Sequence, residues 1–240
     1  MEYKERSAAV QAQEYLQDLI SFKPDIKVLP SQREIADKLR ISRNAVLHSL
    51  DKLKSEDLIS SKERTGIVKN TKVDINMLGM KSMSSELNDD SVAIVHLLTT
   101  IIALPINLQN FFGLETNKLI KIERMRMRKS KPITYEIVYF DQAKFADLIK
   151  VDFTNISLYK LLQKKYGIKP TYGKENITCC LADKKISKIL KIQKNMPLYK
   201  VDSFNYLDND EPLETTTQYL IGSYFKYHFN ANNIYDYRED

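Results

Sequence analysis

The stretch LPSQREIADKLRISRNAVLHSLDKLKSEDLI, residues 29–59, decides how the N-terminal part of the chain folds. Ser31 precedes Glu34 by three residues, which is the spacing of a capping box, where serine and glutamate each pair with the other's backbone amide. A first helix is therefore expected to begin at Gln32. A second serine, Ser42, predicts that another helix starts only a few residues after the first one ends. Two helices joined so closely form a helix-turn-helix.

The second helix is expected to have an inner and an outer face. Val46, Leu50 and Leu53 recur at helical spacing and should point into a core. The residues expected to point outward are Arg43, Asn44, Leu47, His48 and Asp51. The helix thus predicts an exposed, mainly polar surface next to a buried apolar one.

The flanking segments are expected to complete a small domain over residues 1–70. Residues 57–70, DLISSKERTGIVKN, predict two short strands joined by a turn at Gly66, which is the form of a wing. Ala8–Phe22 carries apolar residues at helical spacing and should close the core. The alternative is an ordinary helical hairpin in which the serines serve only as caps.

Residues 29–69 resemble the winged helix-turn-helix of the GntR family of bacterial transcription regulators. The matching segments are LPSQREIA, residues 29–36, and ISRNAVLHSL, residues 41–50, and their length argues against the simple hairpin. The resemblance implies that Arg33 meets the phosphate backbone and that Arg43 reads bases, where an arginine fork discriminates guanine by about 1–3 kcal/mol. The other positions assigned to DNA are Ser42, Asn44, Leu47, His48, Arg64, Thr65 and Gly66.

Two positions of the second helix, and the wing sequence Arg64-Thr65-Gly66-Ile67 in place of Gly-Lys-Gly-Thr, depart from the family pattern. Ala45 and Leu47 stand where the family has a threonine and an arginine that touch DNA, so we expect weaker binding or a changed operator preference. Leu47 is available for contacts with thymine methyl groups. In the wing, Arg64 either reaches the minor groove or a phosphate, or is simply solvated.

The composition changes after residues 71–81, which are polar and predict a linker. Tyrosine- and isoleucine-rich runs then alternate with a few helical patterns, which predicts an α+β fold with an antiparallel sheet over residues 82–240. The expected strands are Ala93–Ala103, Lys118–Arg128, Ile133–Phe140, Tyr172–Leu181, Pro197–Leu207 and Leu213–Ile221. The expected helices are Ile106–Phe112, Ser157–Tyr166 and Asp183–Leu190.

The chemistry of this domain is expected to centre on IERMRMRKSKPITYE, residues 122–136. Arg124, Arg126 and Arg128 alternate along a strand, and therefore share one face. Such a row is either a solvated strand face or an anion clamp, because guanidinium forks bind phosphate and carboxylate bidentately.

Residues 82–229 resemble the UTRA effector domain that follows the winged helix in the HutC subfamily, a domain similar in fold to chorismate lyase. Residues 122–136, 157–168 and 210–220 carry this resemblance. It implies that Arg124 and Arg126 hold the phosphate or carboxylate of an effector. The other implied effector-binding residues are Ser84, Ser85, Glu136, Ser157, Tyr159, Glu214 and Tyr219. The two glutamates accept hydrogen bonds from hydroxyl or amino groups, or else form structural ion pairs, and Tyr219 or Tyr224 replaces a family arginine whose position is Ile221 here.

These patterns and resemblances together predict a ligand-responsive repressor of genes for carbohydrate uptake or use. An activator, or a repressor that needs its ligand, would use the same parts. We expect a homodimer on a palindromic double-stranded operator, released by a small anion, of which a sugar phosphate is favoured over an amino-acid derivative or a carboxylate. Two other classes compete with this one. In the first, the second domain only dimerises and binds no ligand. In the second, the chain is a chorismate-lyase-like enzyme, although fold alone does not carry function.

Charge and cysteine content limit the remaining possibilities. The net charge of +6 permits nucleic-acid binding without locating it. The two cysteines, Cys179 and Cys180, are adjacent, and the three histidines are scattered, so we expect no disulfide, metal or cofactor. The most apolar stretch, residues 92–106, is too short and too polar to span a bilayer, and the N-terminus lacks the apolar run of a signal peptide. We expect a cytoplasmic protein without a membrane partner.

Overall fold

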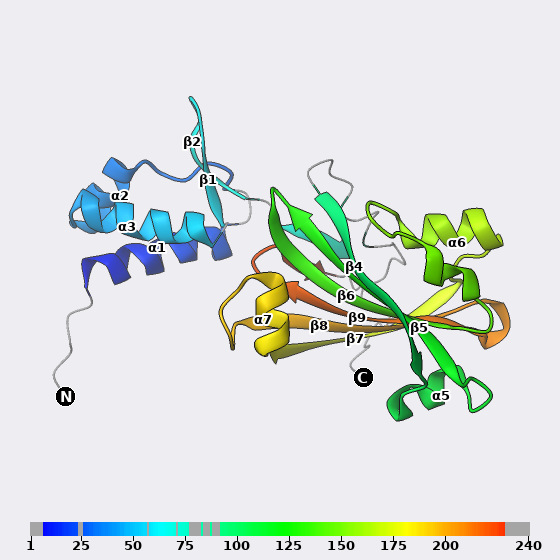
Figure 1. The fold of residues 1–240 in the computed structure, drawn as a ribbon. Helices are drawn as coiled ribbons and strands as arrows, with labels where there is room; N and C mark the ends of the chain where they lie inside the picture. Colours follow the sequence, from blue (N-terminus) through cyan, green and yellow to red (C-terminus); the bar gives the residue numbers. More distant parts are fainter. Residues whose placement is uncertain are drawn as a thin grey trace, which may run out of the picture. The chain divides into compact units, whose positions relative to one another are not determined.

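The structure is a computed structural model of the 240-residue chain. It describes residues 7–23, 26–56, 58–70, 72–76, 83, 87 and 92–228. The chain divides into two compact units, Met1–Lys72 and Val73–Asp240 (Figure 1). No helix within the described ranges is long and apolar enough to cross a membrane.

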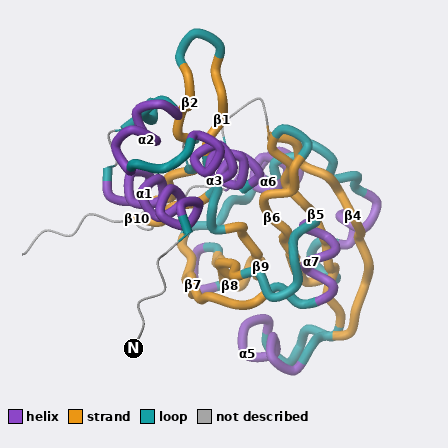
Figure 2. The backbone as a smooth tube through the Cα atoms, turned by 90° about the vertical axis from the view of Figure 1, so that its left-hand side faces the viewer, coloured by secondary structure: helices purple, strands orange, loops and turns teal. Residues whose placement is uncertain are grey.

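The first unit contains the helix-turn-helix and the wing that its sequence predicts. Its elements are α1 (Ala8–Phe22), α2 (Gln32–Leu39), α3 (Arg43–Ser55), β1 (Ile59–Lys62) and β2 (Gly66–Lys69). β1 and β2 pair antiparallel. Their hairpin extends away from the helices of the same unit as a wing (Figure 2).

Serine caps fix the starts of α2 and α3. The Glu34 amide donates to Ser31 Oγ at 3.3 Å, and the Ser31 amide donates to Glu34 Oε2 at 2.7 Å, so the predicted capping box is confirmed. The Ala45 amide donates to Ser42 Oγ at 3.2 Å at the start of α3. The buried apolar core of this unit consists of Ala12, Leu16, Leu19, Leu29, Ile35, Ala36, Val46, Leu50, Leu53 and Ile59.

The turn between α2 and α3 contains a strained residue. Arg40 ends α2 in the left-handed region, at a φ of 55°, where a Cβ crowds the backbone and glycine is the usual occupant. Lys191 ends a helix of the second unit in the same way, at a φ of 54°.

We expect Arg40→Gly to raise the free energy of unfolding of the first unit by about 1 kcal/mol, because glycine adopts this conformation without strain. Urea denaturation followed by circular dichroism measures the change. Lys191→Gly is the matched variant in the second unit and should have the same sign. A loss of stability in both variants would contradict the assignment of strain.

The second unit is an antiparallel sheet of six strands in the order β4-β5-β6-β9-β8-β7. Its strands are β4 (Val92–Ala103), β5 (Lys118–Arg128), β6 (Lys131–Asp141), β7 (Tyr172–Leu181), β8 (Pro197–Tyr206) and β9 (Pro212–Ile221). The connections hold helices α5 (Gln109–Phe112), α6 (Leu158–Tyr166) and α7 (Lys184–Leu190), and 3-10 turns η1 (Ile106–Leu108), η2 (Ala146–Lys150) and η3 (Asp208–Asp210). The predicted α+β architecture is confirmed.

Helices cover both faces of this sheet. Leu162 of α6 packs in one apolar cluster with Ile122 and Val138. On the other face, the Lys185 ammonium of α7 lies 5.7 Å from the centre of the Tyr135 ring. Because Tyr135 and Val138 are three residues apart on β6, they point to opposite faces, so α6 and α7 lie on opposite sides.

A short parallel pair of strands joins the two ends of the second unit. β3 (Val73–Asn76) pairs with β10 (Phe225–His228), and the Val73 amide donates to the Tyr224 carbonyl at 2.8 Å. The segment 71–81, expected to be a linker, therefore contains a strand, while its residues 77–81 lie outside the described residues. The alternation of apolar and polar residues in this strand spans only four positions, which is too short for a sequence pattern to identify.

Candidate functional sites

The outer face of α3 presents the side chains that the sequence predicts to be exposed. Arg43, Asn44, Leu47 and His48 are all exposed, and Leu47 retains 39% of its accessible surface. The opposite face buries Val46, Ser49, Leu50 and Leu53. The outer face of α3 can therefore make polar contacts through most of its side chains and contacts with methyl groups through Leu47.

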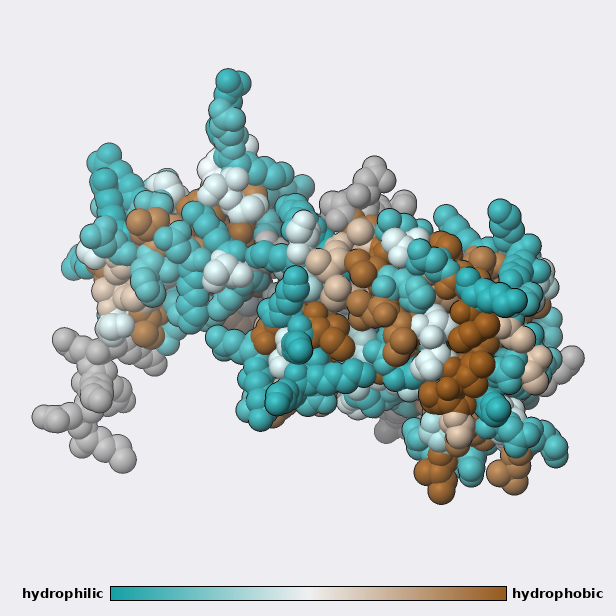
Figure 3. All heavy atoms as spheres, viewed as in Figure 1, coloured by the Kyte–Doolittle hydropathy of each residue, from teal (hydrophilic) through white to brown (hydrophobic). Residues whose placement is uncertain are grey.

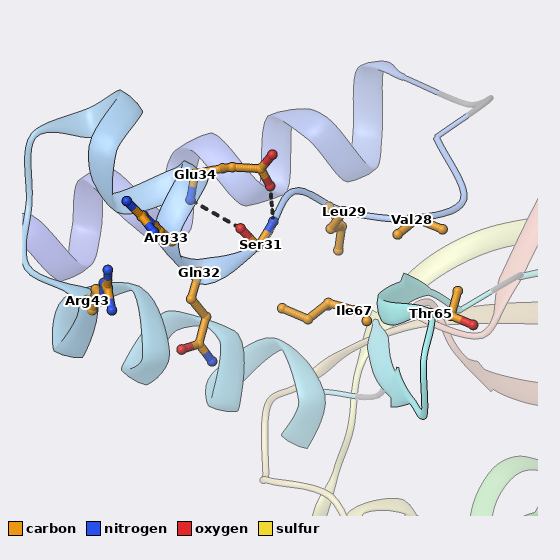
Figure 4. Close-up of a pocket in the computed structure, with 10 residues that line it drawn as sticks. Val28, Leu29, Ser31, Gln32, Arg33, Glu34, Arg43, Thr65 and Ile67 are labelled. Carbon is orange, nitrogen blue, oxygen red and sulfur yellow. Dashed lines mark hydrogen bonds between the residues drawn. The ribbon is translucent and has the colours of Figure 1, made fainter.

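A hollow lies between the start of α2 and the wing (Figure 4). Arg33 and Arg43 lie at one end of it, and Thr65 lies at the other. Arg33 forms an exposed ion pair with Asp37, at 3.7 Å, and such pairs contribute little to stability. The residues lining the hollow are Val28, Leu29, Ser31, Gln32, Arg33, Glu34, Arg43, Thr65, Gly66 and Ile67.

The structure thus brings together several residues that the sequence assigns to DNA. Arg33, Arg43, Thr65 and Gly66 line one hollow although they come from two helices and the wing. Arg64 lies in the wing turn with a φ of 62° and is exposed, but it does not line the hollow. Two guanidinium groups beside exposed backbone suit the phosphate oxygens of a nucleic acid.

In the second unit, two arginines of β5 are buried around one carboxylate. Arg124 and Glu136 are opposite each other on β5 and β6, and Arg124 Nη2 lies 2.6 Å from Glu136 Oε1. Arg126 Nη2 lies 3.7 Å from the other oxygen, Oε2. All three side chains are at most 4% exposed. Burial alone would raise the pKa of Glu136, but the charges of Arg124 and Arg126 outweigh it and leave the pKa below its usual value.

A second buried carboxylate, Glu214, is held by neutral donors. Tyr159 Oη donates to Glu214 Oε1 at 2.8 Å, and Asn205 Nδ2 donates to the same oxygen at 2.6 Å. Thr216 Oγ1 donates to Oε2 at 2.7 Å. Burial raises the pKa of Glu214 in spite of these hydrogen bonds. This network fixes Tyr159 of α6 against β9.

A cavity of about 40 Å³ adjoins the arginine pair. Its lining consists of Met83, Arg124, Arg126, Glu136, Leu158, Tyr159, Thr216 and Gln218. Arg124, Arg126, Glu136 and Tyr159 are thus brought together, as the sequence predicts. Thr216 and Gln218 were missed, although the alternation of β9 from Glu214 places both on this face.

Three of the predicted effector-binding residues do not line the cavity, and two more cannot be placed. Tyr219 does not line the cavity, because it lies opposite Tyr135 on β6 and stacks on that ring with centroids 6.0 Å apart, on the face away from Arg124. Glu214 and Ser157 do not line the cavity: Glu214 lies behind Tyr159 and Thr216, and Ser157 precedes α6 as its N-cap. Ser84 and Ser85 lie outside the described residues.

Each of the two units matches a known protein family. Residues 13–68 match the family of bacterial regulatory proteins called gntR. Residues 89–226, more than half of the chain, match the UTRA domain. The chain belongs to the GntR family of transcription regulators with a UTRA domain.

Several proteins are similar to this GntR regulator over most of their length. It is 23% identical over 214 residues to the mannosyl-D-glycerate transport/metabolism system repressor MngR of Escherichia coli, covering 88% of this chain and 84% of MngR. It is 20% identical over 189 residues to the HTH-type transcriptional regulator YurK of Bacillus subtilis, covering 77% and 78%. The crystal structure of PhnF from Mycobacterium smegmatis superposes with a TM-score of 0.65 at 18% identity, covering 92% of this chain and 99% of PhnF.

The family assignment decides between the classes considered from the sequence. GntR regulators bind operator DNA and, through the UTRA domain, small-molecule effectors. The matched proteins and domains are transcription regulators and not enzymes, so the chorismate-lyase-like alternative is excluded. The protein is a GntR/UTRA transcription regulator.

The two buried glutamates should respond oppositely to pH. Because the pKa of Glu136 is lowered on folding, its stabilisation is present above about pH 4.5 and is lost as the pH falls through the folded-state pKa. We expect Glu136→Gln to cost about 3 kcal/mol at pH 7, since two buried guanidinium groups lose their counter-charge, and to cost less near pH 3. Urea unfolding at both pH values measures this.

Glu214→Gln is the matched control for this experiment. The raised pKa of Glu214 means that its contribution is present below about pH 4.5 and declines as the pH rises through the folded-state pKa. The destabilisation caused by Glu214→Gln should therefore be smaller at pH 7 than near pH 3. The same pH trend in both variants would contradict the assigned charge states.

Proposed function

We propose that this regulator is a HutC-type repressor of genes for carbohydrate uptake or use, released from its operator in the cytoplasm by a phosphorylated sugar. The observation that carries the proposal is the convergence of Arg124 and Arg126 on one buried cavity. Guanidinium forks suit a phosphate. Thr216 and Gln218 line the same cavity and supply polar groups of the kind that pair with sugar hydroxyls. The similarity to MngR, named as the repressor of a mannosyl-D-glycerate system, supports a carbohydrate-linked role.

The size of the cavity indicates how such an effector would act. About 40 Å³ is far less than the roughly 300–1,000 Å³ of a typical small-molecule pocket. A sugar phosphate therefore enters only if side chains of the lining move, and Met83 and Leu158 are its two apolar members. Binding that requires a rearrangement favours one conformation over another, which is the condition for an effector to alter DNA affinity.

The edge strand β4 is the surface that we propose for homodimerisation. Its sequence, VAIVHLLTTIIA, contains no Lys, Arg, Asp or Glu, although exposed edges normally carry charges that prevent pairing. Leu97, Leu98 and Ile101 are 40–46% exposed, and Figure 3 shows hydrophobic residues gathered over β4 and β5. Asn155 pairs with the backbone of Ile94, but no described strand covers the rest of the edge. A second copy would cover it.

A dimer would carry two copies of α3, each reading one half of a palindromic operator. Half-sites read in this way are spaced by about one duplex turn, 34–36 Å. In each copy, Arg33 and the wing residues Thr65 and Gly66 would position the protein on phosphates, while Arg43, Asn44 and Leu47 would contact base edges. An effector that favours a different spacing would lower DNA affinity by about 1–3 kcal/mol.

Arg43→Ala is expected to weaken operator binding about 5- to 150-fold, the equivalent of 1–3 kcal/mol for a lost arginine–guanine fork. Fluorescence anisotropy on DNA from the protein's own promoter, at one fixed salt concentration, measures this. Lys54→Ala is the control, because Lys54 lies at the other end of α3 and pairs with Asp51. Equal binding by Arg43→Ala and wild type would show that α3 is not the reading helix.

The same assay with a panel of sugar phosphates tests the effector. We expect one member to weaken operator binding about 5- to 150-fold and Arg124→Lys to abolish that response, since lysine lacks the planar fork. Light scattering on the same samples should give twice the chain mass of 27.9 kDa. If no member changes DNA affinity, the sugar-phosphate proposal fails.

The small cavity also favours one alternative, a second unit that only dimerises. Thermal shift distinguishes the two, because a ligand that binds the folded state raises the melting temperature by mass action. A melting temperature that stays constant with every sugar phosphate, amino-acid derivative and carboxylate tried would favour the alternative.

A further inference from the structure

Glu136 occupies the part of the arginine pair that an anionic ligand needs. The Nε and Nη2 groups of a guanidinium lie along one edge and together form a bidentate fork. In Arg124, Nη2 is used by Glu136 at 2.6 Å and Nη1 donates to the Ile156 carbonyl at 3.2 Å. Arg124 Nε is buried and has no hydrogen-bond partner among the described residues. Glu136 therefore holds half of this fork, and the other half is unused.

The two oxygens of Glu136 are shared between the two arginines. Oε1 faces Arg124 and Oε2 faces Arg126, which is how a bound carboxylate or phosphate would bridge the pair. The strand register fixes this position, since Glu136 is the direct cross-strand neighbour of Arg124 on one side and of Gln218 on the other. An incoming anion has to displace the carboxylate from at least one guanidinium group.

We propose that Glu136 is a specificity-determining residue that makes the site reject simple anions. This inference rests on the proposed function, because it concerns the same effector site. An anion that displaces Glu136 leaves a buried carboxylate without its partner, and such a group is strongly unfavourable. An effector with hydroxyl or ammonium groups beside its anion supplies new donors to Glu136. Sulfate satisfies the arginines but has no donor to give.

Gln218 and Thr216 favour the same class of effector. Both line the cavity beside Glu136, and Gln218 is only partly buried. The Thr216 hydroxyl already donates to Glu214, so it can serve a ligand only as an acceptor. Glu136, Thr216 and the Gln218 amide oxygen are therefore acceptors next to the cations of the cavity, and the Gln218 amide nitrogen is a donor. The complement is a molecule that carries an anion and several donors on adjacent atoms.

Sulfate binding to the full-length protein tests this inference without DNA or sugar. Isothermal titration calorimetry and thermal shift are run with sodium sulfate against sodium chloride at equal ionic strength. We expect no saturable sulfate effect in the wild type and a gain of at least about tenfold in sulfate affinity for Glu136→Gln. The double variant Glu136→Gln with Arg124→Lys should lose that gain.

Glu123→Gln is the matched control. Glu123 is also a buried carboxylate of β5, paired with Lys121 at 2.5 Å and with Lys185 at 3.3 Å, but it lies on the opposite face of the sheet and lines no part of the cavity. We expect its sulfate response to equal that of the wild type. An equal gain in Glu123→Gln would mean that any lost carboxylate recruits sulfate, and the inference would fall.

Two further results decide the matter. The inference is overturned if the wild type binds sulfate saturably and Arg124→Lys removes that binding. It is also overturned if Glu136→Gln folds but does not bind sulfate more tightly than the wild type. If Glu136→Gln does not fold, Glu136→Asp replaces it, because the shorter side chain withdraws the carboxylate by one methylene. We expect Glu136→Asp to gain part of the sulfate affinity, and the absence of any gain would contradict the inference. If Glu136→Gln gains sulfate affinity but no sugar phosphate changes the DNA affinity of the wild type, the role of Glu136 stands and only the sugar-phosphate effector is rejected.

Discussion

The second unit is organised around the cost of burying two like charges side by side. Two guanidinium groups removed from water on one strand repel each other, and each loses its hydration. Their burial becomes tolerable only with an anion between them, and the antiparallel register of β5 and β6 supplies one by placing Glu136 opposite Arg124. The position of β6 relative to β5 is therefore constrained by charge as well as by apolar packing, because a shift of one residue would move the carboxylate to the other face.

The surroundings of this ion cluster keep it in place through neutral contacts. The Phe153 ring lies 5.9 Å from the guanidinium carbon of Arg124, and the carbonyl of Ile156 accepts from the same group. Glu214 is held by three uncharged donors, so it fixes Tyr159 without adding a strong competing anion. One carboxylate is thus tuned toward ionisation and the other away from it within the same domain. A polar interior of this kind is stable when its members are satisfied, and it remains responsive to a molecule that offers different partners.

Local signals in the sequence predicted a large part of this structure. The capping box at Ser31 and Glu34 fixed the start of α2 because its hydrogen bonds are made within four residues, and the alternation of Arg124 and Arg126 placed both on one face. Tyr219 was misplaced because the resemblance offered a role for it, whereas the alternation of β9 puts Gln218 on the cavity side. β3 could not be predicted, since its partner β10 is about 150 residues away and no local pattern reports such a pairing. The size of the cavity depends on side chains from three strands, a helix and Met83, and it has no signature in any single segment.

The pairing of β3 with β10 has a consequence for how regulators of this type are assembled. The first strand of the second unit, β3, is hydrogen-bonded to its last described strand, β10. The folded part of this unit therefore begins at Val73. Only Asn70, Thr71 and Lys72 separate β2 of the wing from that closure. A gene fusion that exchanges the DNA-binding unit for another one must therefore be joined within these three positions. A junction at residue 81 would remove β3 and leave β10 without its partner strand.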